Sequence, residues 1–181
     1  MSAHVQSHWF KTHVHVALAT AFLLLFCDGS LASSTASGSR TKPATILIKR
    51  PHGLMLAVAD EQPDKIKNVV YAANRIIGKP YKWGGGHLKR LDSGYDCSGA
   101  ISYALSEAGI IPGSKHCREY LQFGRPGKGR WLTLWVHEKH IFMTIFGRTF
   151  DVCVNKTKTG PRWVPTGRST AGFQPRHIPG L

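Results

Sequence analysis

The sequence is short of acidic residues. Asp and Glu make up only 10 of its 181 residues, against 24 Lys and Arg, so the formal net charge is +14 at pH 7. This imbalance excludes a surface of evenly paired charges and indicates an anionic partner. Charge alone leaves nucleic acid, anionic wall polymers, peptidoglycan carboxylates and acidic membranes open, and a solvated basic surface is the simpler alternative.

Cysteine is also scarce. The chain has four, and no two of them have the Cys-x-x-Cys spacing of a zinc or redox motif, so we expect neither a metal centre nor a cofactor. Cys97, Cys117 and Cys153 follow the first 32 residues. In an oxidising compartment this odd number leaves at least one thiol unpaired. Cys117 and Cys153 could pair and spare Cys97, but the sequence does not fix the connectivity.

No apolar run is long enough to span a membrane comfortably. The longest, Val14–Cys27, follows Lys11 and precedes Ser30-Leu31-Ala32, which has small residues where a signal peptidase cleaves. We therefore expect residues 1–32 to be a signal peptide and the protein to be secreted or periplasmic. Export argues against nucleic acid as the partner, and no stable membrane insertion is expected after cleavage.

The remaining chain has room for one domain with one core. Residues 33–45 are small, polar and aperiodic, which is typical of a flexible linker. Residues 46–181 are then a single domain, which we expect to be monomeric. Its last part, residues 155–181, is rich in Pro, Gly and Arg and is predicted to be an irregular tail that packs back on the domain.

Periodicity predicts two helices followed by strands. Apolar residues recur every three or four positions over 63–77, and again over 97–108, where Asp96 stands as the N-cap. Strand composition follows in three segments, at 131–136, 140–146 and 149–154. Helices followed by strands indicate an α+β domain.

Cys97 falls in the first turn of the second helix. An ordinary thiol, with a pKa of about 8.5, is only slightly ionised at neutral pH, and the thiolate is the nucleophile. A helix N-terminus lowers a thiol pKa by about one unit at most, so activation also needs a neighbouring imidazolium. A cysteine at this position, taken alone, is more often a small buried residue than a nucleophile.

His140 has the best context among the histidines, because it opens a strand that is otherwise apolar. His137 lies three residues earlier, on the opposite face if the strand extends that far. His87 and His116 lie in loops near Cys97 in sequence and are either substrate contacts or exposed side chains. An interior histidine with a structural role is the alternative for His140.

The residues also carry a family resemblance. Gly78-Lys-Pro-Tyr-Lys-Trp-Gly-Gly85, followed by Tyr95-Asp-Cys-Ser-Gly-Ala100 at a helix start, resembles the loop and nucleophile motifs of the NlpC/P60 family of cell-wall peptidases. Lys139–Gly147 is similar to the family's histidine strand, and Thr149–Val152 to the strand that carries its third polar residue. The resemblance extends over residues 63 to 153.

The resemblance implies a cysteine peptidase with a papain-like α+β fold, in which the nucleophile helix packs on a small antiparallel β-sheet. Cys97 would attack an amide carbonyl, His140 would exchange the proton, and Asp151 would orient His140. The implied activity is that of a cell-wall endopeptidase, which cleaves peptidoglycan stem peptides next to D-amino acids.

Four further residues are substrate-binding candidates by the same resemblance. Tyr81 would line the pocket and assist the oxyanion, while Asp96 and Ser98 would face polar groups of the substrate. Trp83 is the fourth. For Tyr81 and Trp83, packing over the core is an equally good interpretation.

The chain departs from the family pattern at two places. Pro126-Gly-Lys-Gly-Arg-Trp131 replaces the usual Pro-Gly-Asp-Leu, and Phe142 replaces a small glycine, which leaves substrate preference open. Two alternatives to a peptidase stay open as well. One is a non-catalytic cationic wall-binding protein on the same fold, and the other is an acyltransferase of the same superfamily.

The third polar residue is ambiguous on geometry. Gly147-Arg148 is predicted to be a two-residue hairpin turn. That register pairs Asp151 with Thr144, about 13 Å along the strand from His140. Asn155 then lies opposite His140 and is the alternative to Asp151.

Overall fold

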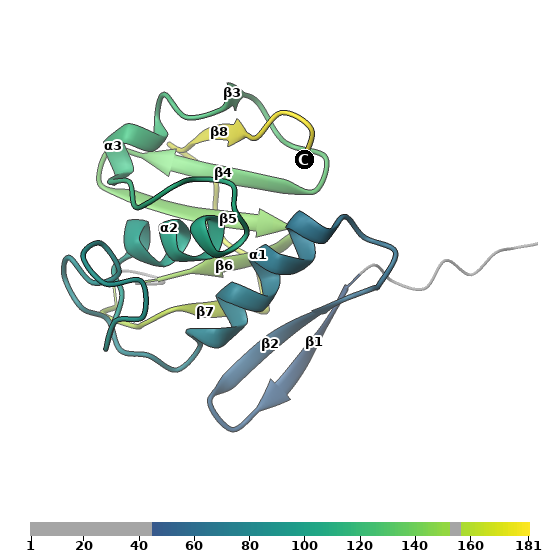
Figure 1. Ribbon diagram of the computed structural model, residues 1–181, viewed down its shortest axis with the longest axis vertical. Coiled ribbons are helices and arrows are strands. Elements are labelled where there is room, and N and C mark those ends of the chain that lie inside the picture. Colours follow the sequence, from purple (N-terminus) through teal and green to yellow (C-terminus); the bar gives the residue numbers. More distant parts are fainter. Residues whose placement is uncertain (1–44, 153–156) are drawn as a thin grey trace, which may run out of the picture. The chain divides into compact units, whose positions relative to one another are not determined.

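The computed structural model describes residues 45–152 and 157–181 (Figure 1). The predicted signal peptide, all but the last residue of the predicted linker, Cys153 and Asn155 lie outside these ranges. The described residues form an α+β fold in which the strands of both sheets pair antiparallel. In these residues, no helix is long and apolar enough to cross a membrane.

Two of the helices coincide with the predicted ones. Helix α1, Asp64–Arg75, buries Ile66, Val69 and Val70 on one face. Helix α2, Cys97–Glu107, begins at Asp96, whose carboxylate accepts a hydrogen bond from the Gly99 N–H at 2.7 Å. The N-cap prediction is therefore confirmed. A third, four-residue helix, α3 at Cys117–Tyr120, was not predicted.

A two-stranded hairpin that was not predicted precedes α1. Strands β1, Thr45–Arg50, and β2, Gly53–Val58, pair in register from Thr45 and Val58 to Arg50 and Gly53. The Asn74 side chain exchanges two hydrogen bonds with the Leu56 backbone, at 2.8 and 3.0 Å. Its oxygen also accepts from Trp163 Nε1 at 2.8 Å, so one α1 residue joins the hairpin to the C-terminal part of the chain.

The main sheet has six strands in the order β3-β8-β4-β5-β6-β7. The three predicted strands are present in it as β4, β5 and β6. The bounds are β3 Arg125–Pro126, β4 Leu132–His137, β5 His140–Ile145, β6 Arg148–Asp151, β7 Arg162–Val164 and β8 Gln174–His177.

Strands β7 and β8 correct the expectation that the last part of the chain is irregular. β7 pairs with β6, and β8 pairs with β4 on the other side of the sheet. Trp163 is buried and its ring centroid lies 5.2 Å from that of Phe150, which fixes β7 on the core. Strands of three and four residues, one of which contains Pro175, are too short to show an alternating pattern.

The turn between β5 and β6 is also displaced from its predicted place. Ile145 pairs with Arg148, so the turn residues are Phe146 and Gly147, not Gly147 and Arg148. Both have positive φ, 48° and 76°, as the turn that matches strand twist requires. Moving the turn back by one residue shifts the register by two and leaves each side chain on its predicted face.

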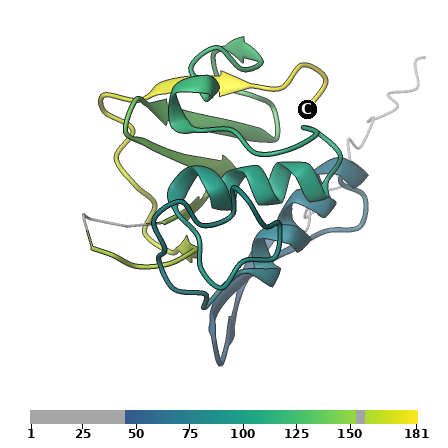
Figure 2. The ribbon, with the colours of Figure 1, turned by 60° about the vertical axis from the view of Figure 1, so that its left-hand side comes forward.

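Helix α2 packs against both α1 and β5. Figures 1 and 2 show α1 and α2 side by side along the sheet, with the N-terminal end of α2 near the loop that follows α1. This packing places the first turn of α2 beside the first residue of β5, and the core fills the space between the helices and the sheet.

The start of α2 approaches the 83–86 loop very closely. A Cβ atom on Gly99 would overlap the carbonyl oxygen of Gly85, and one on Gly85 would overlap the carbonyl of Gly94. The Asp96 N–H donates to the Gly85 carbonyl at 3.2 Å. Glycine at 99 therefore lets the helix touch the loop, and glycine at 85 lets the loop touch the backbone of Gly94.

We predict that Gly99→Ala destabilises the protein by about 1–3 kcal/mol, because the added methyl must push the helix and the loop apart. Gly113→Ala is the matched control, since Gly113 has open space around its Cβ position and no positive φ. Thermal melts of the two variants measure the difference. Equal melting temperatures would show that the Gly85 contact does not constrain the fold.

Candidate active site

Cys97 is the first residue of α2 and lies in a pocket of about 660 Å³. The walls come from the 81–84 loop, the start of α2, the start of α3 and the β4–β5 turn. Cys97 is partly exposed to this pocket. The first backbone N–H groups of a helix have no partner within the helix, so the thiol lies where a negative charge is stabilised.

His140 is the first residue of β5 and lines the same pocket. Its Nε2 contacts Asp151 Oδ1 at 2.8 Å, which leaves Nδ1 as the ring nitrogen for a second partner. The His140 and Cys97 side chains are close enough for each to shift the pKa of the other. The structure thus brings Cys97 together with His140 and Asp151, which are distant from it in the sequence.

Asp151 reaches His140 because of the displaced turn. Extending the register by one residue sets Asp151 opposite Phe142, which is two positions from His140 on the same face. Such diagonal neighbours are about 7–8 Å apart at Cα, within reach of a histidine and an aspartate. The predicted separation of about 13 Å was wrong.

Asp151 is held from its other side by Arg168. The Asp151 side chain is fully buried, its Oδ1 also accepts from the Val152 N–H at 2.7 Å, and its Oδ2 pairs with Arg168 Nη1. The Arg168 guanidinium lies over Phe142 and Phe173, 4.9 and 5.4 Å from the two ring centroids. Sequence reasoning missed Arg168, since nothing in the local pattern marks a contact of this kind.

Phe173 also packs on the His140 ring. The two rings meet edge-on, with their centroids 6.1 Å apart. Phe173 meets Phe142 in the same way, with ring centroids 4.9 Å apart. Phe142, where the NlpC/P60 pattern has glycine, is fully buried beneath this contact. These contacts confirm the expectation that the last part of the chain packs back on the domain.

His140 is positively charged at neutral pH. Burial opposes the charged form, but the hydrogen bonds and negative charges of Asp151 and Cys97 outweigh it and raise the His140 pKa to about 9. An imidazolium next to the thiol is the second element that activation of Cys97 requires.

Cys97 has a second neighbour, which was not foreseen as part of the site. The Cys117 sulfur, at the first residue of α3, lies 3.7 Å from the Cys97 sulfur. Both thiols are free, and Cys153, the partner considered for Cys117, lies outside the described residues.

The two thiols titrate as a pair. The contact with Cys117 and burial raise the pKa of Cys97, and they outweigh His140, which lowers it. The contact with Cys97 lowers the pKa of Cys117. These opposite directions have one cause, since charge on one sulfur opposes charge on the other at this distance. The pair therefore loses its first proton more readily than its second.

The remaining histidines have other positions. His87 Nε2 contacts Asp96 Oδ1 at 3.1 Å and Ser98 Oγ at 3.2 Å, and its ring stacks on His116 with centroids 4.4 Å apart. His137 pairs directly with His140 across the β4–β5 turn, so the alternative that placed both on one strand was wrong.

The four substrate-binding candidates all line the pocket. Asp96 is occupied by the protein itself, because its oxygens accept from Gly99, Ser98 and Gly84 and contact His87. Trp83 is 86% exposed at the pocket, which disfavours the alternative that it only covers the core. Tyr81 packs partly against the core and also lines the pocket, so its position does not choose between the two interpretations.

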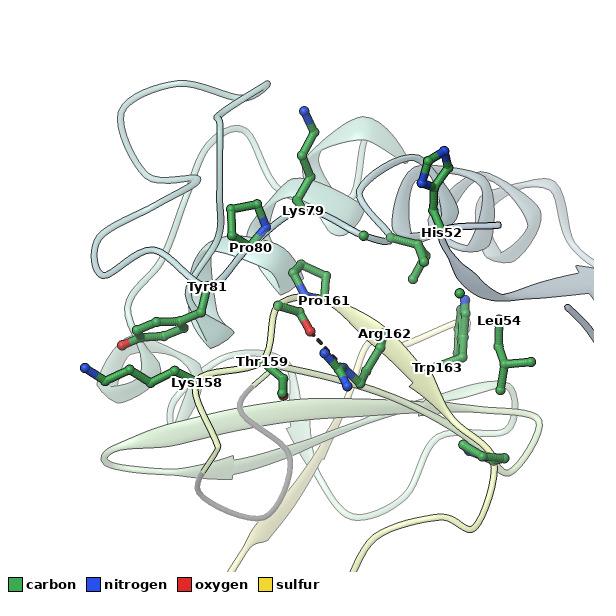
Figure 3. Close-up of a pocket in the computed structure, with 15 residues that line it drawn as sticks. His52, Leu54, Lys79, Pro80, Tyr81, Lys158, Thr159, Pro161, Arg162 and Trp163 are labelled. Atoms are coloured by element: carbon green, nitrogen blue, oxygen red, sulfur yellow. Dashed lines mark hydrogen bonds between the residues drawn. The ribbon is translucent and has the colours of Figure 1, made fainter. Parts of the chain in front are cut away.

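A second pocket, of about 630 Å³, adjoins the first at Tyr81, which lines both (Figure 3). Its walls carry Lys79, Lys158 and Arg162 and no acidic residue. Figure 3 shows that these cations do not converge: Lys79 points away from Arg162, and Arg162 donates to the Gly160 carbonyl at 3.2 Å. Within residues 45–152 and 157–181, no His, Cys, Asp and Glu cluster could hold a metal ion.

No protein-family model matches the chain. The peptidoglycan endopeptidase RipB of Mycobacterium tuberculosis, in strains CDC 1551 / Oshkosh and H37Rv, is 32% identical over a match that covers 39% of this chain and 39% of RipB. The match supports the resemblance to the NlpC/P60 family. The chain spans about two fifths of the length of these relatives.

We predict that Asp151→Asn lowers the His140 pKa from about 9 toward its ordinary value, because the negative charge beside the ring is lost. Histidine NMR titration of the folded variant measures this shift. Glu138→Gln is the control, since Glu138 lines the pocket but pairs with Arg118. An unchanged His140 pKa in Asp151→Asn would mean that the carboxylate does not set the charge of the ring.

We also predict that Cys117→Ala lowers the pKa of Cys97, since the neighbouring sulfur no longer competes for the charge. The rate of Cys97 alkylation by iodoacetamide, followed against pH by peptide mass spectrometry, should have its midpoint at a lower pH than in the native protein. Cys117→Ser should behave in the same way, because a hydroxyl does not ionise in this range. A midpoint that stays the same or rises would show that Cys117 does not raise the pKa of Cys97.

Proposed function

We propose that this protein is an exported cysteine peptidase that hydrolyses amide bonds in peptidoglycan stem peptides. One observation carries the proposal: a thiol at the start of a helix shares a pocket with a charged imidazole that contacts a buried carboxylate. The partial match to a peptidoglycan endopeptidase supports a cell-wall substrate. The fold we propose is papain-like, with α2 as the nucleophile helix on the antiparallel sheet.

In the first step, the Cys97 thiolate attacks the carbonyl carbon of the amide. The carbonyl oxygen then carries a negative charge, which backbone N–H groups in the first turn of α2 stabilise. Gly99 N–H already donates to Asp96, so the N–H groups nearer to Cys97 serve the oxyanion. Tyr81, in the adjacent wall, assists them.

His140 carries the proton between steps. Its imidazolium gives a proton to the departing amine as the carbon–nitrogen bond breaks, and a thioester on Cys97 remains. The neutral imidazole then takes a proton from water, which attacks the thioester and releases the carboxylic acid. The thiolate and the imidazolium are restored.

Asp151 and Arg168 orient the ring rather than touch the substrate. Nε2 is fixed by Asp151, so Nδ1 faces Cys97, and Arg168 prevents the Asp151 carboxylate from rotating away. Burial behind Phe173 keeps water from competing for these contacts.

The substrate lies along the pocket beside Trp83, Tyr81 and Ser98, and we propose that all three contact it. The chain's net charge of +14 favours an anionic polymer such as peptidoglycan over a neutral one. Export through residues 1–32, with 46–181 as a monomeric catalytic domain, completes the proposal.

We predict that Cys97→Ala lowers the release of peptide fragments from peptidoglycan by about a thousandfold or more, since the nucleophile is removed. Mass spectrometry of the soluble products, with the newly formed amino termini, measures the activity. Binding of both proteins to the insoluble wall is the control and should be equal.

Equal fragment release by the native protein and Cys97→Ala would remove Cys97 from the mechanism. Binding without any release by either protein would favour a wall-binding protein. Products that incorporate an added amine in place of water would favour an acyltransferase.

A further inference from the structure

We propose that Cys97 and Cys117 form an oxidation site: peroxide converts the two thiols into a reversible disulfide that blocks the pocket's nucleophile. The bond itself depends only on the two sulfurs, whereas the loss of activity that follows rests on the proposed function. Cys117 has no part in the peptidase mechanism, so its position needs a separate explanation.

The geometry brings the sulfurs close to bonding distance. They lie 3.7 Å apart, and a disulfide of about 2.05 Å requires each sulfur to move by less than about 1 Å. Rotation about the Cα–Cβ bonds supplies movements of this size. Both sulfurs face the same pocket, which is large enough to admit a peroxide molecule.

The pairing is built into the fold rather than left to a mobile loop. Tyr120, at the end of α3, shares a hydrogen bond of 2.9 Å between its hydroxyl and Ser102 Oγ on α2. The Lys115 N–H donates to the same Ser102 oxygen at 2.9 Å. α3 is therefore tied to α2 on both sides of Cys117.

The chemistry proceeds in two balanced steps. The Cys97 thiolate attacks hydrogen peroxide, the O–O bond breaks, and sulfenic acid and hydroxide form. The Cys117 sulfur then attacks the Cys97 sulfur, the S–O bond breaks, and the displaced hydroxide takes the Cys117 proton to give water. Two electrons pass from the thiols to the peroxide, and an added dithiol returns them when it reduces the bond.

The two neighbouring thiols favour a disulfide over oxidation of Cys97 to sulfinic or sulfonic acid. Because each sulfur opposes charge on the other, the pair loses one proton more readily than two, and a single thiolate starts the reaction. A sulfenic acid without a neighbouring thiol proceeds to sulfinic and sulfonic acids, which dithiols do not reduce. Cys117 thus protects the nucleophile in an oxidising compartment, at the expense of activity while the bond lasts.

The test treats the full chain with hydrogen peroxide and compares it with Cys117→Ser. Peptide mass spectrometry without reduction should find the Cys97 and Cys117 peptides joined and two hydrogen atoms lighter than their sum. Fragment release from peptidoglycan should fall at least about tenfold and return after dithiothreitol. In Cys117→Ser, Cys97 should reach sulfinic acid, and dithiothreitol should not restore that variant's own starting activity.

Two results would overturn the proposal. One is sulfinic acid on Cys97 forming as fast in the native chain as in Cys117→Ser. The other is a bridge to Cys153 in place of the Cys97–Cys117 bridge. The mass measurement needs no substrate, so a protein that forms the bond but never cleaves peptidoglycan would refute the proposed function alone.

Discussion

The candidate site depends on one close backbone contact, between the first turn of α2 and the 83–86 loop. Gly99 has no side chain, so the helix backbone lies directly on the Gly85 carbonyl, and Asp96 joins the helix and the loop by accepting from Gly84 and Gly99. This contact determines where Cys97 emerges and which N–H groups face the pocket. A larger residue at Gly99 would push the first turn of α2, and with it the thiol, away from a histidine that the sheet holds in place.

The histidine side of the site depends on strand register instead. Because Phe146 and Gly147 make the turn, Asp151 lies diagonal to His140 and its carboxylate reaches the ring. The carboxylate has two oxygens, and the second is used by Arg168 from a segment with no regular structure of its own. A local turn thus determines which acid meets the histidine, and a distant arginine holds that acid in one orientation.

The sequence predicted the parts of this arrangement that have local signals. A 3.6-residue period marks α1, an acid before an apolar stripe marks the start of α2, and β-branched and aromatic runs mark the central strands. The short β7 and β8 have too few residues for a period. Cys117 reaches Cys97, and Arg168 reaches Asp151, only through tertiary contacts, which no local pattern records.

Several of the few acidic residues have structural roles in or beside the site. Of the few carboxylates, Asp96 caps α2, Asp151 holds His140, and Asp92 accepts from Lys82 and from the Gly86 N–H beside the pocket loop. These acids are used inside the protein, where each one fixes a backbone segment or a ring. The basic residues far outnumber them, so most of the positive charge is left without an internal partner and acts on whatever approaches the pocket from outside. The few acids thus order the site, and their scarcity leaves the chain with its net positive charge.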